Sequence, residues 1–369
     1  MKQKIEISII VPVYNAERFL ETTIQSVLRQ NAPWAELVLV NDGSRDGSPA
    51  ICQKYSCEQV QYISIPNGGA GHARNVGIDH ARGDWILFLD SDDLIRGNFF
   101  TEELRQFLAG EQQTDILYTP KVLCDFALSG EPKIVYPEPL EQIEHFMPDL
   151  EFWACIYRTE FLRSRQVRFF EYQKQDVESA FRFRAFSRAS CIKTAPEQLF
   201  YVHRDNPSSN VNTWNWDKVL EIKSRVYYEL FREFDRPEQD TKIWLYTQSM
   251  YYAKELLELC CKEGFQENEK EIIGQLVRDL DFQAHPRMTA LLPVRYRVLV
   301  RLLQQMQKQA FVWKAYCHIC ERKQRARPAA STDPALEPDH IPAILERLDL
   351  YTEIIERAYT MNHPRKESK

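Results

Sequence analysis

The chain has 369 residues, with 47 Lys and Arg against 53 Asp and Glu and a formal net charge of −6 at pH 7. Hydrophobic residues make up 44% of the chain and aromatic residues 12%, which supplies enough apolar surface for a packed core and excludes a wholly disordered protein. A general nucleic-acid binder normally carries a basic excess, so the mild acidity argues against nucleic acid as a partner.

Targeting and cysteine signals favour a cytoplasmic protein. Residues 1–6 are polar, and the apolar run at 7–13 is short and interrupted by Pro12, so we expect no export signal. No stretch approaches the ~18 uninterrupted apolar residues of a transmembrane segment. The 9 cysteines are an odd number scattered over a long chain, which favours reduced and inert thiols over a disulfide framework.

The first hundred residues alternate short apolar runs, typical of buried strands, with segments of helical spacing. In chain order the pattern predicts strand 7–13, helix 17–30, strand 36–40, helix 48–55, strand 60–65, helix 71–81 and strand 84–89. This order is typical of an α/β fold in which helices flank a mostly parallel, Rossmann-like sheet. Ligands of such sheets bind outside the carboxyl ends of the strands. Polar clusters follow three of the predicted strands there, namely Tyr14-Asn15, Asn41-Asp42 and residues 90–93.

The rest of the chain changes character twice. Residues 149–210 have an α+β pattern rich in aromatic and basic side chains, in which Tyr201 and Val202 fit an ordinary edge strand. From Trp216 onward the apolar spacing is helical, up to a proline-rich linker at about 327–342 and a last helix at about 344–359. We therefore expect an α/β domain over residues 1–212 and an all-α C-terminal domain over residues 213–369.

A glycine-rich turn precedes the third predicted helix. Gly69-Ala70-Gly71-His72-Ala73-Arg74 partly matches a dinucleotide-binding fingerprint, but Arg74 replaces the third glycine and this is the third βα unit rather than the first. The pattern therefore argues against a hydride-transferring oxidoreductase. Asn67-Gly68-Gly69 is better interpreted as a turn whose glycines permit positive φ.

The acidic run Asp90-Ser91-Asp92-Asp93 follows the fourth predicted strand. Three carboxylates in four residues repel one another unless positive charge lies among them. Magnesium typically uses one or two carboxylates together with substrate phosphate oxygens, so the run is a candidate metal site. The alternative is a solvated turn in which Asp92 or Asp93 caps the helix predicted at 99–108.

Four motifs together resemble those of family 2 glycosyltransferases, which use the GT-A fold and act on nucleotide sugars. They are Ser8-Ile9-Ile10-Val11-Pro12-Val13-Tyr14-Asn15, Val40-Asn41-Asp42-Gly43-Ser44-Arg45-Asp46-Gly47-Ser48, Asn67-Gly68-Gly69-Ala70-Gly71-His72-Ala73-Arg74-Asn75-Val76-Gly77 and Phe88-Leu89-Asp90-Ser91-Asp92-Asp93. They occur in the order of the family. The likeness is dense over residues 5–100 and is traceable to about residue 210.

The resemblance implies a donor site built from these motifs and from a later strand. The implied nucleotide-sugar-binding residues are Pro12, Tyr14, Asn15, Asp42, Arg74, Asp90, Ser91 and Arg204. In this assignment Asp42 accepts a hydrogen bond from the base, and Asp92 is the ligand of a Mg²⁺ or Mn²⁺ ion that bridges both phosphates of the donor. Such an ion neutralises the charge that develops on the leaving nucleoside diphosphate.

Inverting transfer also needs a base for the acceptor hydroxyl, and the resemblance implies a Glu-Asp pair near residue 175. This sequence has Gln175-Asp176, so Asp176 is the candidate catalytic base and Glu178 is the reserve. The alternative for Asp176 is an exposed acid in the first turn of a helix at 176–186. By the same resemblance Trp153 is a candidate acceptor-binding platform, although a core tryptophan is equally common.

The C-terminal segment 294–327 has the pattern of a basic amphipathic helix. One interpretation is peripheral contact with the inner face of the plasma membrane, where lipid-linked acceptors are found. The others are a helix packed on the catalytic domain with a solvated basic face, and an oligomer contact.

The resemblance thus implies metal-dependent transfer of a sugar from a UDP-sugar to a saccharide or lipid-linked acceptor, with inversion, in bacterial surface polysaccharide synthesis. Gln175 keeps open a catalytically silent saccharide-binding protein on the same fold. A nucleotidyltransferase would require a Gly-rich basic loop after the first strand, and Tyr14-Asn15-Ala16-Glu17 is not one. The identity of the sugar, the acceptor, the linkage and the oligomeric state stay open.

Overall fold

The computed structural model describes residues 4–125, 127–135, 151–171, 177–195, 201–205 and 341–349. The chain divides into two compact units, and all the described residues belong to the first, which comprises Met1–Leu140, Asp149–Ser209 and Ala335–Lys369. The boundary predicted at residue 212 and the basic segment 294–327 lie outside the described residues.

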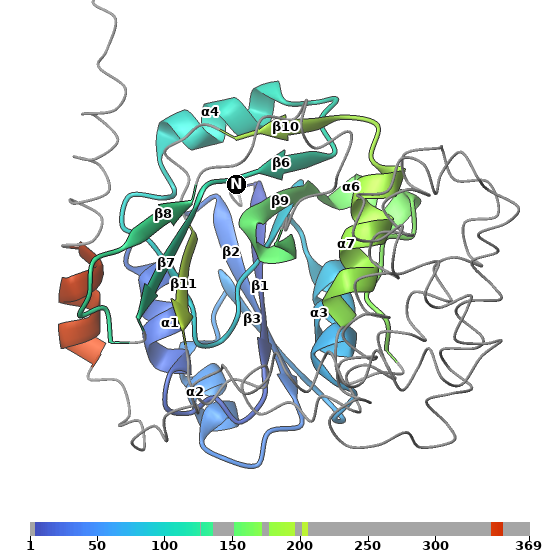
Figure 1. The fold of residues 1–369 in the computed structure, drawn as a ribbon. Coiled ribbons are helices and arrows are strands. Elements are labelled where there is room, and N and C mark those ends of the chain that lie inside the picture. Colours follow the sequence, from blue (N-terminus) through green and yellow to red (C-terminus); the bar gives the residue numbers. More distant parts are fainter. Residues whose placement is uncertain are drawn as a thin grey trace, which may run out of the picture. The chain divides into compact units, whose positions relative to one another are not determined.

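A seven-stranded sheet forms the centre of this unit, in the order β10-β6-β9-β4-β1-β2-β3 (Figure 1). Its strands are β1 (Ile7–Val13), β2 (Ala35–Asp42), β3 (Val60–Ile65), β4 (Trp85–Phe88), β6 (Ile116–Tyr118), β9 (Cys155–Arg158) and β10 (Ile192–Thr194). Neighbouring strands are parallel, except that β9 is antiparallel to both β4 and β6. Every residue of β1 and β2 is buried, which explains their continuous apolar runs. The mostly parallel α/β fold is therefore confirmed.

Helices cover both faces of this sheet. They are α1 (Leu20–Leu28), α2 (Ser48–Tyr55), α3 (Ala70–His80), α4 (Glu102–Gly110), α6 (Thr159–Ser164) and α7 (Val177–Arg188). Figure 1 shows α1 and α2 on one side of the sheet and α3, α6 and α7 on the other. Helix α3 lies close against β1, because a Cβ added at Gly77 would meet Ile10 Cγ2 at 2.3 Å.

A second sheet, not predicted from the sequence, has the strand order β5-β11-β7-β8. Its strands are β5 (Leu94–Ile95), β7 (Lys121–Asp125), β8 (Lys133–Val135) and β11 (Tyr201–Asp205). Strand β11 pairs antiparallel with β5 and parallel with β7. The expectation of an edge strand at Tyr201 and Val202 is therefore wrong, because β11 has a hydrogen-bonded neighbour on each side.

The helical residues 341–349 pack on the second sheet. Ile344 and Leu348, one helical turn apart, are buried against Leu94 of β5 and Val202 of β11. The sequence pattern predicts this segment as part of the C-terminal helical domain, with a linker that extends to about residue 342. In the structure residues 341 and 342 are already helical, and burial of the two apolar side chains attaches the segment to the first unit.

None of the helices in the described part of the chain has the length and hydrophobicity that a transmembrane segment requires.

Candidate active site

The three polar clusters that follow β1, β2 and β4 lie at one edge of the sheet. Strand β1 pairs in parallel with β2 on one side and with β4 on the other, so the carboxyl ends of all three strands meet there. The side chains singled out from the sequence come from three separate motifs, and the topology alone brings them together.

The loops after β1 and β2 are hydrogen-bonded to each other. The Asn15 backbone N–H donates to Ser44 Oγ at 3.1 Å, and the Arg45 backbone N–H donates to Asn15 Oδ1 at 2.9 Å. Asn15 has a φ of 49°, a conformation that asparagine tolerates better than most residues. This turn leaves Tyr14 49% exposed at the rim, whereas Pro12 is buried within β1. An exposed tyrosine ring at a sheet edge is available to stack on a planar ligand.

Asp42, the last residue of β2, is 2% exposed. Its Oδ1 accepts from the Gly68 N–H at 2.7 Å, and its Oδ2 accepts from the Gly69 N–H at 2.9 Å and from Asn67 Nδ2 at 3.1 Å. Gly69 has a φ of 93°, so the turn interpretation of Asn67-Gly68-Gly69 is confirmed. The carboxylate therefore fixes the loop that begins α3. A carboxylate offers about four lone-pair sites, so Oδ1 has one acceptor position beyond its bond from Gly68.

Arg74 on α3 reaches the acidic loop after β4. Its buried guanidinium contacts Asp90 Oδ1 at 2.7 Å and lies over the rings of Phe152 and Phe169, at 4.6 and 5.3 Å from their centroids. Glu178 Oε1 of α7 is 3.8 Å from the same Arg74 nitrogen. Arg74 thus joins α3, the acidic loop and α7 through one side chain.

The three carboxylates of the acidic loop have different environments. Asp90 pairs with Arg74, and buried Asp93 accepts from the Arg204 backbone N–H of β11 at 2.8 Å. Thr23 Oγ1 of α1 donates to the Ser91 carbonyl at 2.9 Å, so the loop is held from two sides. The helix-cap alternative for the loop is wrong, because α4 begins at Glu102 and Thr101 Oγ1 accepts from the Leu104 N–H.

Asp92 is half-buried between these two fixed carboxylates. In the described part of the chain no three His, Cys, Asp or Glu residues form a complete ligand cluster. Magnesium needs no such cluster where donor phosphates supply oxygens, and a single carboxylate held on a fixed loop fits that use. The residues present therefore fit a cation that is bound jointly by Asp92 and a nucleotide.

Two other predicted site residues are buried. Trp153 is 7% exposed, and the Lys121 ammonium lies 5.1 Å from the centroid of its ring. Its environment is that of a core tryptophan with one face covered by a cation. Arg204 is 1% exposed on β11, next to Asp93. Gln175 and Asp176 lie outside the described residues, between Glu171 and α7.

Two residues that organise this edge make contacts that the sequence does not predict. Asn67, predicted only as a turn residue, donates to both the carbonyl and the carboxylate of Asp42. Thr23 donates to the Ser91 carbonyl, and its place within a helical pattern gives no signal of this role.

Comparisons with known proteins agree with this geometry. Residues 8–143 match the family model described as Glycosyl transferase family 2. An uncharacterized glycosyltransferase, EpsJ of Bacillus subtilis, is 35% identical over 225 residues, which are 55% of this chain and 62% of EpsJ. The poly(ribitol-phosphate) beta-N-acetylglucosaminyltransferase TarS of Staphylococcus aureus is 28% identical over 204 residues, which are 53% of this chain and 35% of TarS.

The fold is also that of a solved relative. The crystal structure of S. aureus TarS 1–349 in complex with UDP-GlcNAc superposes with a TM-score of 0.65 at 20% identity, covering 88% of this chain and 93% of that one. The chain spans 62% of EpsJ and about a third of full-length TarS. The fold is thus GT-A, and the part of the chain that carries the four motifs is similar to glycosyl transferase family 2.

Proposed function

We propose that this chain is a metal-dependent, inverting glycosyltransferase that uses a UDP-sugar and a saccharide or lipid-linked acceptor in the synthesis of bacterial surface polysaccharide. The observation that carries the proposal is the arrangement at the carboxyl edge. Exposed Tyr14, the fixed Asp42 turn, the Arg74–Asp90 pair and the half-buried Asp92 follow strands or begin a helix at this one edge. The UDP and UDP-GlcNAc bound in the TarS structures support uracil as the base of the donor.

In this proposal Tyr14 and the open acceptor position of Asp42 Oδ1 bind the nucleoside. Asp90 is oriented toward the donor by Arg74, and Asp92 together with the donor phosphates holds Mg²⁺ or Mn²⁺. When bound, the cation balances the negative charge that develops on the departing diphosphate. Arg204, whose backbone N–H donates to Asp93, is proposed to add positive charge near the departing diphosphate.

Asp176 is the proposed base. It removes the proton from the acceptor hydroxyl while the acceptor oxygen attacks the anomeric carbon and the bond from that carbon to the diphosphate oxygen breaks. Attack from the face opposite the leaving group inverts the anomeric carbon. A positioned base typically contributes about 10²–10⁴-fold in rate. Glu178 is the reserve candidate, and its carboxylate is 3.8 Å from the Arg74 guanidinium.

The test is release of nucleoside diphosphate from a panel of UDP- and GDP-sugars with Mn²⁺ or Mg²⁺. We expect turnover of one UDP-sugar, loss of turnover with chelator, and a fall of at least about 10²-fold in Asp92→Asn. Asp84→Asn is the matched control, since Asp84 is an exposed carboxylate at the opposite end of β4 whose partner is Lys4. Binding of UDP without turnover of any donor would favour the silent saccharide-binding protein, and absence of nucleotide binding by folded protein would overturn the proposal.

A further inference from the structure

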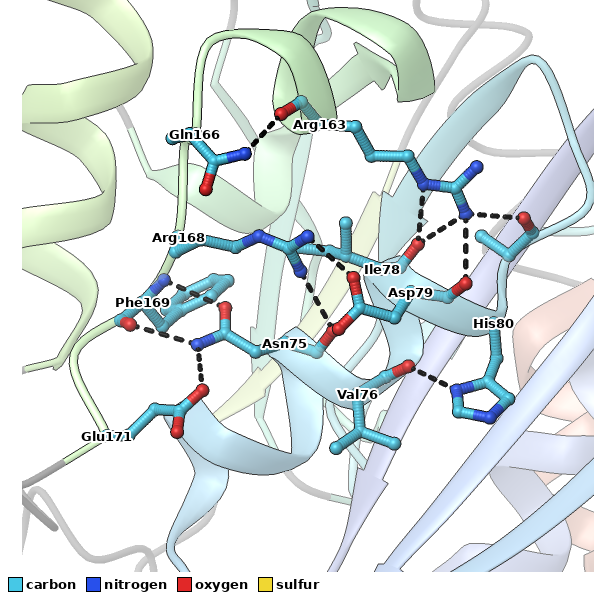
Figure 2. Close-up of polar contacts among 11 residues, drawn as sticks. Asn75, Val76, Ile78, Asp79, His80, Arg163, Gln166, Arg168, Phe169 and Glu171 are labelled. Atoms are coloured by element: carbon cyan, nitrogen blue, oxygen red, sulfur yellow. Dashed lines mark hydrogen bonds and ion pairs between the residues drawn. The ribbon is translucent and has the colours of Figure 1, made fainter.

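The acidic loop after β4 is held by helices from both faces of the sheet. From one face, Arg74 of α3 pairs with Asp90. Helix α3 is itself anchored, because Asn75 Oδ1 accepts from the Phe169 N–H and Asn75 Nδ2 donates to the Phe169 carbonyl, each at 3.0 Å (Figure 2). Residues 163–168 add contacts to the C-terminal half of the same helix. The Asp90 end of the loop therefore rests on a fixed helix.

From the other face, α1 and the residues just after it present polar side chains to the backbone that follows β4. The bonds run from Thr23 to the Ser91 carbonyl at 2.9 Å, from the Ile95 N–H to Ser26 at 3.2 Å and from the Phe99 N–H to Gln30 at 2.8 Å. The order is the same along both segments, and positions 23 and 26, three residues apart, share one face of the helix. This face of α1 therefore sets the path of the chain after β4.

Both peptide groups next to Asp92 are hydrogen-bonded. The Ser91 carbonyl, which belongs to the peptide unit that enters Asp92, accepts from Thr23 Oγ1. The Asp93 N–H, which belongs to the peptide unit that leaves Asp92, donates to the Asp90 carbonyl at 3.1 Å. Since a peptide unit is planar, a bond to one of its polar groups restrains the orientation of the whole unit. The backbone at Asp92 is thus restrained from both sides.

The two restraints differ in origin. The bond from Asp93 to Asp90 lies within the turn itself, whereas Thr23 belongs to another element, 68 residues away along the chain. Thr23 is completely buried, and a second acceptor for its hydroxyl, the Phe19 carbonyl of its own helix, is more distant at 3.5 Å. A hydroxyl has one proton to donate, so the shorter contact directs it to the Ser91 carbonyl.

We infer that Thr23 is a positioning residue for the cation that Asp92 is proposed to bind. Its hydroxyl restrains the Ser91 peptide unit, and that unit sets the direction in which the Asp92 carboxylate leaves the loop. The inference rests on the proposed function. Without the hydroxyl the Ser91 carbonyl loses this donor and the peptide unit gains freedom to rotate. Removal of a group that orients a metal ligand typically costs about 10–100-fold in metal affinity.

The experiment titrates Mn²⁺, in the presence of UDP, into the whole 369-residue chain carrying Thr23→Val or Thr22→Val. Thr22 is the matched control, because it is the neighbouring residue of α1, is 1% exposed, and has a hydroxyl without a hydrogen-bond partner in the described part of the chain. We expect the half-saturating concentration of Mn²⁺ to rise by about tenfold in Thr23→Val and to stay within about twofold of wild type in Thr22→Val. The affinity for UDP in chelator should stay within about twofold of wild type in both variants, because Thr23 acts through the metal ligand.

A third variant, Thr23→Ser, separates hydrogen bonding from packing. It keeps the hydroxyl and loses the methyl group, so it should return the half-saturating concentration of Mn²⁺ to within about threefold of wild type, whatever its melting temperature. A structural role alone would predict that melting temperature, UDP affinity in chelator and Mn²⁺ affinity fall together. That result, an equal Mn²⁺ requirement in Thr23→Val and Thr22→Val, or no recovery in Thr23→Ser would overturn the inference.

Two further measurements keep the test decisive. If Thr23→Val does not fold, Thr23→Ala removes the hydroxyl without placing a methyl group against the Ser91 carbonyl, and a Mn²⁺ requirement within about twofold of wild type would then overturn the inference. If the wild type shows no Mn²⁺-dependent binding of UDP, the proposed function fails on its own, and amide hydrogen exchange judges the role of Thr23. Peptides covering 91–95 should exchange at least about tenfold faster in Thr23→Val than in Thr22→Val, and equal exchange would contradict the inference.

Discussion

The two ends of strand β2 each bury a carboxylate, and they hold it in different ways. Glu36, near the start of β2, is 1% exposed and accepts from Ser8 Oγ, Gln61 Nε2 and both the backbone N–H and Nε of Arg82. Asp42, at the end of the same strand, is bound by two backbone N–H groups and a side-chain amide. A guanidinium therefore neutralises the charge at the start of β2, whereas only neutral donors hold the charge at its end.

This difference explains why chemistry is expected at one edge only. Both carboxylate oxygens of Glu36 accept hydrogen bonds, from Ser8 of β1, from Gln61 of β3 and from Arg82 in the loop before β4. These bonds join the strands at this end of the sheet. At the carboxyl edge the neutral donors organise the Asn67-Gly68-Gly69 turn and leave the negative charge of Asp42 in place. That charge suits the donor groups of a nucleotide base, as the proposed function requires.

The largest expected effect on stability comes from removing the Glu36 carboxylate at the start of β2. Glu36→Ala removes the carboxylate that accepts from the Ser8 hydroxyl, the Gln61 amide and the Arg82 backbone N–H. This loss should lower the free energy of unfolding by about 3 kcal/mol. Urea denaturation monitored by circular dichroism measures this change. The UDP Kd of the folded fraction should not move, and a tenfold weaker Kd would show that the two edges are not independent.

A smaller loss of stability, together with a larger loss of UDP binding, is expected when Asp42 at the carboxyl edge is changed. Asp42→Asn places an NH₂ group against the N–H donors of the Asn67-Gly68-Gly69 turn, which should cost about 2 kcal/mol and displace the start of α3. We expect UDP binding, measured by calorimetry, to weaken by at least tenfold, which is about 1.4 kcal/mol. Unchanged binding would mean that the turn takes no part in the donor site.

Lowering the pH tests the comparison at Asp46, which lies in the loop after β2. Burial acts to raise the pKa of the Asp46 carboxyl, but hydrogen bonds from the Ser48 hydroxyl and from the Glu17 and Ser48 backbone N–H groups hold it below its usual value. A depressed native pKa contributes stability that is present above the unfolded value near 3.9 and is lost as pH falls through the native value.

Asp46→Asn should therefore be less stable than wild type at pH 7, and the difference in urea midpoint should shrink below about pH 4. A difference that stays constant from pH 7 to pH 3 would show that hydrogen bonding of the ionised form is not its source.

The smallest effect concerns thiol reactivity. Burial raises the pKa of Cys52 on α2 and of Cys155 on β9 to about 12, whereas Cys57 is exposed. Because the thiolate is the reacting form, alkylation at pH 8 with peptide mapping should label Cys57 readily and leave the other two unlabelled until the protein unfolds. Rapid labelling of native Cys155 would contradict the packing of β9.

The sequence predicts the first half of this fold well for a simple reason. Runs 7–13 and 60–65 are compact and β-branched, so the bounds of β1 and β3 match them. Strand β2 extends to Asp42 because pairing with its neighbours continues past the apolar run. The second sheet has strands of two to five residues that pair across long sequence separations, and no local pattern specifies such pairing.

The same limit applies to the candidate site. The motifs identify Tyr14, Asp42, Arg74 and Asp92 as candidate site residues. They do not show which groups donate hydrogen bonds to the Asp42 carboxylate, or that Arg74 faces Glu178. Those contacts depend on how β2, α3 and α7 are placed in three dimensions. The spacing of Ile344 and Leu348 likewise shows an apolar helix face and cannot say which sheet receives it.

The most direct test of the central claim is calorimetric titration of UDP into the wild-type protein and into Asp92→Asn, each with Mn²⁺ and with chelator. We predict one-to-one binding to the wild type with Mn²⁺, and binding at least tenfold weaker both in chelator and in Asp92→Asn. Equal affinity under all four conditions would contradict a metal-dependent nucleotide site at the carboxyl edge.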